Sequence, residues 1–174
     1  MLLGIPMRSL SASLIVGFVL WMAPVASART CDGATRLVAL GGNLRADDLL
    51  RGPFDGSSLQ LAFDTSNFST TISLGDSRGT AHDLTLFFTR IGPDEWTVAP
   101  GVQAEFASDT LVLLAPVRTL RFNARGRMRT GRRTVVSAQF SGATPQRIVI
   151  DLSEMTQRPS PSGISGLTVS GCVR

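Results

Sequence analysis

The sequence predicts an all-β fold, a single compact domain of the β-barrel or sandwich kind. Beyond the N-terminal segment, no stretch of about a dozen residues repeats its apolar positions at helical spacing. Instead, short stretches in which apolar and polar residues alternate recur along the chain, and Gly and Pro separate them. Residues 29–174 also have the length of one domain with its own core.

The N-terminal segment has the three parts of an export signal. Met1–Arg8 is short and basic, Leu10–Met22 is apolar and almost uncharged, and Ala26–Ala28 supplies small residues for cleavage. A retained membrane anchor is the alternative, but this apolar run is shorter than the roughly 20 residues that a span needs. We therefore expect a cleaved signal peptide at residues 1–28, a single domain at 29–174 without a stable membrane span, and a location in the periplasm, at the cell surface or outside the cell.

Strand candidates follow one another along the rest of the chain. The first half predicts strands at 35–42, where Gly41 and Gly42 stop the strand, and at 59–65, 68–76, 82–90 and 96–100. Residues 91–95 place Gly and Pro at turn positions and join the last two strands as a hairpin. The second half predicts strands within 109–117, 118–128, 134–140 and 146–153, followed by an extended tail at 155–171.

The residues that carry chemistry do not form a convincing site. His82 is the one histidine, so a Ser–His–Asp hydrolase would have to use it, with Asp76 or Asp83 and with Ser77 or another serine. Because His82 begins a strand just after a turn, we expect a surface or packing histidine instead. Two distant cysteines and one histidine do not make a zinc set. We therefore expect a protein that is not an enzyme and holds no metal or cofactor.

Cys31 and Cys172 are the two cysteines, near the two ends of residues 29–174. In an exported protein an even pair suggests a disulfide, and two unrelated free thiols are the alternative. A disulfide would close a loop over almost the whole domain, for which the chain-entropy estimate is about 4–5 kcal/mol. It would also hold the two ends of the domain side by side.

Arginine supplies all 17 basic residues, and the formal net charge of +4 is too small to make a strong case for nucleic acid. Seven arginines gather within residues 118–133: Arg118, Arg121, Arg125, Arg127, Arg129, Arg132 and Arg133. On a hairpin they would form a basic edge that contacts an anionic surface such as polysaccharide or lipid headgroups. The alternative is a solvated hairpin that blocks edge-to-edge aggregation. Only Phe122 lies beside them for stacking on single-stranded nucleic acid.

Residues 68–98, FSTTISLGDSRGTAHDLTLFFTRIGPDEWTV, resemble the D2 domain of bacterial flagellar hook proteins. That family has a strand, a "DSLG" turn, an "H-x-L-x-L-x-F" strand and a turn before "W-x-V". The matching positions are Asp76, Ser77, Gly79, His82, Leu84, Leu86, Phe88, Trp96 and Val98. Arg78 and Gly75 stand where the family usually has leucine and tyrosine. The likeness extends over residues 36–172, through "GGNLRADD", "TLRFNARGRM" and the "D-x-S-x-x-T-Q" pattern that begins at Asp151.

The resemblance implies architectural roles for these residues. Gly79 permits the turn, Leu84, Leu86 and Phe88 face the core, and Trp96 caps the hairpin. The implied function is an exported, non-catalytic structural or interaction module whose partners are other envelope or flagellar-type proteins.

Hook subunits differ from this sequence in two respects. They carry long amphipathic helical segments at both ends, and they leave the cell without a cleaved signal. We therefore expect a free-standing D2-like domain in which a Cys31–Cys172 disulfide holds the entry and exit strands together.

Overall fold

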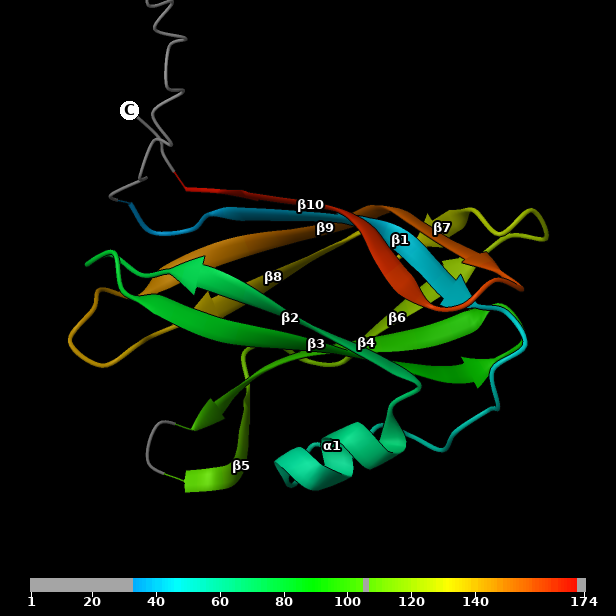
Figure 1. The fold of residues 1–174 in the computed structure, drawn as a ribbon, viewed down its shortest axis with the longest axis horizontal. Coiled ribbons are helices and arrows are strands. Elements are labelled where there is room, and N and C mark those ends of the chain that lie inside the picture. The colour runs from blue at the N-terminus through cyan, green and yellow to red at the C-terminus, as the bar shows by residue number, and fades with distance from the viewer. Residues whose placement is uncertain (1–32, 105–106, 172–174) are drawn as a thin grey trace, which may run out of the picture.

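The computed structural model describes residues 33–104 and 107–171, and it confirms the all-β prediction. Two sheets lie face to face, and one short helix, α1 (Leu59–Thr65), covers the outer side of one of them (Figure 1). The strands within the described residues are β1 (Leu37–Arg45), β2 (Phe68–Gly75), β3 (Ala81–Gly92), β4 (Glu95–Ala104), β5 (Ala107–Leu113), β6 (Arg118–Phe122), β7 (Met128–Thr130), β8 (Arg133–Ala138), β9 (Gln146–Arg158) and β10 (Gly163–Ser170).

The first sheet, which we call sheet A, joins the two ends of the described chain. Its strand order is β10-β1-β9-β8, and β1 lies antiparallel to β10 and parallel to β9. The prediction that Gly41 and Gly42 stop the first strand is wrong, because β1 continues to Arg45 and only shifts register at these glycines. A Cβ on Gly42 would lie 2.3 Å from the carbonyl oxygen of Gly163. Glycine therefore lets β1 and β10 approach closely here.

The second sheet, sheet B, has the order β2-β3-β4-β6-β7, with β5 paired to β4. β2 and β3 pair antiparallel from Phe68–Phe88 to Gly75–Ala81, and β3 returns through the predicted turn into β4. At one corner the two sheets meet, because Arg127 forms an isolated antiparallel bridge to Thr156 on β9. That corner brings the arginine-rich segment onto sheet A.

The main core lies between the two sheets. Apolar side chains of sheet A pack there against those of sheet B, and the larger fully buried ones are Leu40, Leu44, Ile148, Ile150, Leu152, Leu74, Leu84, Leu86, Phe88, Trp96 and Leu120. A smaller cluster lies on the outer face of sheet B, where Ala62 of α1 packs on Phe87 and Ala99. Figure 1 shows α1 on this side, away from β1 and β9.

The strand predicted at 59–65 is wrong, since these residues form α1. The Ser58 hydroxyl accepts a hydrogen bond from the Leu61 amide at 3.1 Å and caps the helix N-terminus. Helical spacing then turns Ala62 inward, while Leu61 and Phe63 remain about half exposed. The alternation of apolar residues, which predicted a strand, therefore does not correspond to a buried face.

In the described part of the chain, no helix is long and apolar enough to cross a membrane.

Candidate functional site

The turn Asp76–Thr80 joins β2 to β3 and is organised by one carboxylate. Oδ1 of Asp76 accepts hydrogen bonds from the amides of Arg78 at 2.7 Å and Thr80 at 2.9 Å, and Oδ2 lies 2.9 Å from Nε2 of His82. The hydrogen bond with His82, and then the two amides, hold the pKa of Asp76 below its usual range. Gly79 adopts a positive φ of 80°, which glycine tolerates.

His82 is held in place as a packing residue. Its ring stacks on Phe140 with centroids 3.7 Å apart and planes 6° apart, and its Nε2 faces the carboxylate of Asp76. The carboxylate partner is enclosed by the fold, because Asp76 is only 2 % exposed. The arrangement ties the β2–β3 turn to the segment that follows β8.

The prediction of a packing histidine assumed that the chain has no G-x-S-x-G pattern, and this is wrong, because Gly75–Gly79 matches that hydrolase pattern. The structure gives it another role. The turn joins two strands rather than a strand and a helix. The Ser77 hydroxyl accepts a hydrogen bond from the Thr144 amide at 2.9 Å, and Nε2 of His82 is engaged with Asp76. Ser77 and His82 therefore do not form a nucleophile–base pair in this structure.

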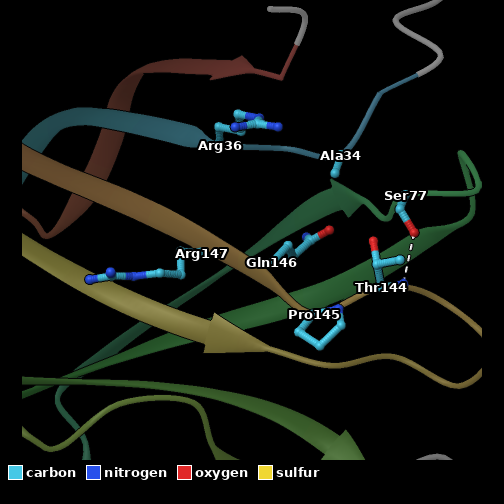
Figure 2. A pocket seen from close by; sticks show the side chains of 7 residues that line it. All are labelled: Ala34, Arg36, Ser77, Thr144, Pro145, Gln146 and Arg147. Atoms are coloured by element: carbon cyan, nitrogen blue, oxygen red, sulfur yellow. Dashed lines mark hydrogen bonds between the residues drawn. The ribbon is translucent and has the colours of Figure 1, made fainter.

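Beside this turn lies a pocket of about 310 Å³. Figure 2 shows its lining residues, which are Ala34, Arg36, Ser77, Thr144, Pro145, Gln146 and Arg147. The side chains of Arg36 and Arg147 point in different directions, so they do not form one anion-binding pair (Figure 2). Nε2 of Gln146 donates to the Gly75 carbonyl at 3.3 Å, which fixes the amide orientation. Oε1 of Gln146 is enclosed, without a partner in the described part of the chain.

The predicted core positions lie between the sheets. Leu84, Leu86 and Phe88 have no exposed surface and belong to the main cluster. Trp96 is also fully buried, and its indole Nε1 donates to Oε1 of Gln157 at 3.2 Å. Trp96 therefore connects the β3–β4 hairpin to β9 of the other sheet.

Gln157 is a residue to which the sequence interpretation assigned no role, although it ends the "D-x-S-x-x-T-Q" pattern. Its side chain also donates to the Pro93 carbonyl at 2.7 Å, and its amide donates to the Gly126 carbonyl at 2.9 Å. Two other segments of the family pattern, residues 68–98 and the TLRFNARGRM stretch, therefore converge on one buried glutamine. The sequence order of the motifs could not indicate that convergence.

The turn Asn123–Arg127 carries two of the seven predicted arginines. Oδ1 of Asn123 accepts hydrogen bonds from the amides of Arg125 at 2.9 Å and Arg127 at 3.0 Å. Gly126 has a positive φ of 70°, and its amide donates to the Asn123 carbonyl at 2.7 Å. Because Gly126 also accepts from Gln157, the turn is fixed against β9.

The seven arginines have different surroundings. Arg121 pairs with Glu95 at 2.9 Å and Arg133 pairs with Asp151 at 2.8 Å, so acids compensate these two charges. Arg132 donates to the Met128 carbonyl at 3.3 Å. The remaining four side chains have no ion pair with any described residue: Arg118, Arg125, Arg127 and Arg129. The basic edge is therefore smaller in net charge than the count of seven suggests.

Two pockets open among these arginines. One, of about 540 Å³, is lined by Arg121 and Arg129 but also by Asp94 and Glu95, so its charges balance. The other, of about 420 Å³, we call the Arg127 pocket, and its lining residues are Arg127, Met128, Arg132, Ser153, Glu154, Met155, Thr156 and Arg158. Arg158 comes from β9 and lies outside the predicted set, because only the fold brings β9 to this hairpin.

The predicted signal peptide, Cys31 and Cys172 lie outside the described residues. Within 33–104 and 107–171, no group of three potential metal ligands comes together.

Comparison with known proteins identifies relatives of this chain. A family model described as "Flagellar basal body protein FlaE D2 domain" matches residues 55–172. The flagellar hook protein FlgE of Escherichia coli K12 is 28% identical over 134 residues, which are 74% of this chain and 31% of that protein. A solved 32 kDa fragment of the hook protein FlgE from Caulobacter crescentus matches with a TM-score of 0.49 and 18% identity, covering 60% of this chain and 46% of the fragment. The chain thus spans about a third of the hook protein that it matches.

Proposed function

The chain belongs to the flagellar basal body protein FlaE D2 domain family, and on this premise we propose that it is an exported, non-catalytic module that contacts other envelope or flagellar-type proteins. The family match covers both sheets apart from β1, and its pattern residues build the core rather than a site. A structural role therefore agrees with where these residues lie.

The observation that carries the proposal is the free edge of β10. This strand ends sheet A, and Gly163–Ser170 contains no charged residue. Leu167 and Val169 pair with Leu40 and Val38, which are buried, so they face the same side of the sheet. They nevertheless remain 51% and 42% exposed. The outermost strand therefore presents apolar side chains that the described residues do not cover.

A strand from a neighbouring protein would satisfy this edge. Its main chain would pair with the outward-facing amides and carbonyls of β10, and its apolar side chains would cover Leu167 and Val169. The opposite edge of sheet A is different, because β8 begins at the ion-paired Arg133 and its Ser137 amide already donates to the Leu114 carbonyl. Partner contact is therefore expected at β10 and not at β8.

A matched pair of photo-cross-linking positions tests this proposal. Val169 on β10 and Val135 on β8 are 42% and 41% exposed, so a photo-reactive residue at either has equal access to solvent. We expect the full chain, expressed in its host, to form adducts with envelope or flagellar-type proteins from position 169 only. Equal adducts from both positions, or none from position 169 in a folded chain, would contradict the proposal.

Export and closure by a disulfide are part of the same proposal. Gly33, two residues after Cys31, and Gly171, directly before Cys172, support it because they lie close together: a Cβ on Gly33 would be 3.3 Å from the Gly171 oxygen. We expect a mature N-terminus at Arg29 and a Cys31–Cys172 bond in the periplasm or outside the cell. Peptide mass mapping without reduction checks both, and two free thiols in the exported chain would rule out the bond.

A second candidate function uses the arginines that lack acidic partners. Arg118, Arg125, Arg127 and Arg129 leave uncompensated positive charge on the hairpin, and Arg158 adds to it from β9. This arrangement favours contact with an anionic surface such as polysaccharide or lipid headgroups. Binding of the full chain to an acidic polysaccharide should weaken steeply as salt rises, whereas binding that does not depend on salt would exclude this candidate.

A further inference from the structure

Three arginines from two separate segments line the Arg127 pocket: Arg127 and Arg132 from the hairpin, and Arg158 from β9. We propose that this pocket binds one acidic sugar unit of a polysaccharide, with the guanidinium groups contacting its carboxylate or sulfate. The inference rests on the second candidate function and locates it at one site.

The backbone places these side chains on one surface. Arg127 and Thr156 are directly opposite in an antiparallel bridge, so their side chains point to the same side. Along β9 the side chains alternate, and Met155 and Gln157 are buried at 1% and 6% exposure. Glu154 and Arg158 therefore lie on the same outer surface as Thr156.

The pocket carries an excess of positive charge. The pocket is lined by three arginines and one acid, Glu154. In the described part of the chain, Glu154, Arg127 and Arg158 have no ion-pair partner within 4.0 Å. Elsewhere on the basic edge Glu95 and Asp151 offset Arg121 and Arg133, and in the neighbouring pocket of about 540 Å³ two acids balance two arginines. An oxyanion entering the Arg127 pocket would meet several guanidinium donors, which suit carboxylate and sulfate geometry.

The surroundings favour a sugar over a membrane or a nucleic acid. Ser153 and Thr156 line the pocket, where the Thr156 hydroxyl already donates to the Gly42 carbonyl at 3.0 Å, and the volume of about 420 Å³ is the size of a small-ligand site. No large apolar side chain is exposed within residues 118–133 or 153–158 that could insert into a lipid surface. Phe122 is 4% exposed and packs in the core, so it cannot stack on a base.

The test compares two triple variants of the full chain that remove equal charge. Arg127→Gln, Arg132→Gln and Arg158→Gln alter the pocket, whereas Arg118→Gln, Arg125→Gln and Arg129→Gln alter the hairpin outside it. The probes are polygalacturonate and dextran sulfate, with neutral dextran as the control, measured by calorimetry at low salt. We expect the pocket variant to lose affinity for at least one acidic probe about tenfold or more, and the hairpin variant about threefold or less.

Glu154→Gln is expected to strengthen binding, an effect that misfolding of the variant would not produce. Removal of the lone carboxylate should strengthen binding of the acidic probe by about threefold, because the incoming anion no longer meets a like charge. Thermal unfolding of each variant establishes that the fold is retained.

The outcomes distinguish failure of the Arg127 pocket from failure of the second candidate function. Equal losses in the two triple variants would leave the anionic-surface function standing and overturn the pocket. Binding of anionic phosphatidylglycerol vesicles or single-stranded DNA, without binding of either acidic polysaccharide, would overturn the sugar ligand. No binding of any anionic probe would overturn the second candidate function together with the pocket.

Discussion

The turns Asp76–Thr80 and Asn123–Arg127 have the same hydrogen-bond pattern in different surroundings. In each, the first residue accepts two amides through Oδ1, and the glycine three positions later has a positive φ and donates to the first residue's carbonyl. Around Gly79 nothing lies within 4 Å of an added Cβ, whereas at Gly126 the Gln157 oxygen would be 2.0 Å away. The same turn geometry therefore occurs once with open space around its glycine and once packed against β9.

The different surroundings of Gly79 and Gly126 show which property of glycine each turn requires. At Gly79 only the backbone conformation calls for glycine, because a side chain would have room. At Gly126 the absence of a side chain is itself necessary, since the main chain of β9 occupies the space. The first residue also differs, as Asp76 brings a charge that Asn123 does not.

The largest effect is expected from Gly126→Ala. The new Cβ would overlap the Gln157 carbonyl, so either the turn or β9 must move, and the amide of Gln157 would lose its acceptor. We expect the free energy of unfolding to fall by roughly 3–5 kcal/mol. Urea unfolding followed by circular dichroism measures it. A loss no larger than that of Gly79→Ala would show that β9 does not fix this turn.

Asn123→Ala should have the next largest effect. It removes the acceptor of the Arg125 and Arg127 amides, and we expect a loss of about 1–2 kcal/mol in the free energy of unfolding. Asn123→Asp is the matched control, because it keeps the acceptor oxygen and should retain stability within about 0.5 kcal/mol. Equal losses in the two variants would mean that the acceptor does not hold the turn.

The charge of Asp76 predicts a dependence on pH that the second turn lacks. Its pKa is lowered in the folded state, mainly by His82, so its stabilising effect is complete above the ordinary value of 3.8 and disappears as pH falls through the folded-state pKa. Asp76→Asn should therefore be less stable than the natural chain at neutral pH, and the difference should shrink toward zero in acid.

Measuring the free energy of unfolding of both chains between neutral pH and strong acid checks this. Asp83→Asn is the control, because Asp83 is exposed on β3, the strand that follows the turn, and its replacement removes the same charge. A constant difference between the Asp76→Asn variant and the natural chain over the whole range would contradict the expectation.

Gly79→Ala should have the smallest effect of the four. The positive φ would strain the alanine backbone, but the Cβ would meet no neighbour, so we expect a loss of about 1 kcal/mol. Gly79→Asn should lose less, because asparagine tolerates this conformation better. Thermal unfolding of the two variants tests the order, and an asparagine variant less stable than the alanine one would contradict it.

Much of the fold was predictable because strands leave a local signal. Alternation marked β2, β3 and β8, and Gly and Pro marked the β3–β4 turn. The failures have local causes that alternation does not register. The Ser58 cap and the burial of Ala62 made a helix of 59–65, and Gly41 and Gly42 produced a register shift where a strand end was expected.

The arginine surface was predictable only in part. The count within 118–133 marked the hairpin, but not that Glu95 and Asp151 neutralise Arg121 and Arg133. Arg158 was missed because its neighbours in space come from the other sheet. Pairing between strands that are distant in sequence decides both points, and a single sequence holds no direct record of it.

The position of β1 sets the order in which the domain can be completed. Sheet B needs only residues that follow one another from Phe68 to Thr130, whereas β1 must wait for β9 and β10, more than about a hundred residues later, before either of its sides is paired. A chain delivered N-terminus first would therefore carry an unpaired, apolar β1 until β9 emerges, and β1 would keep one open edge until β10 follows.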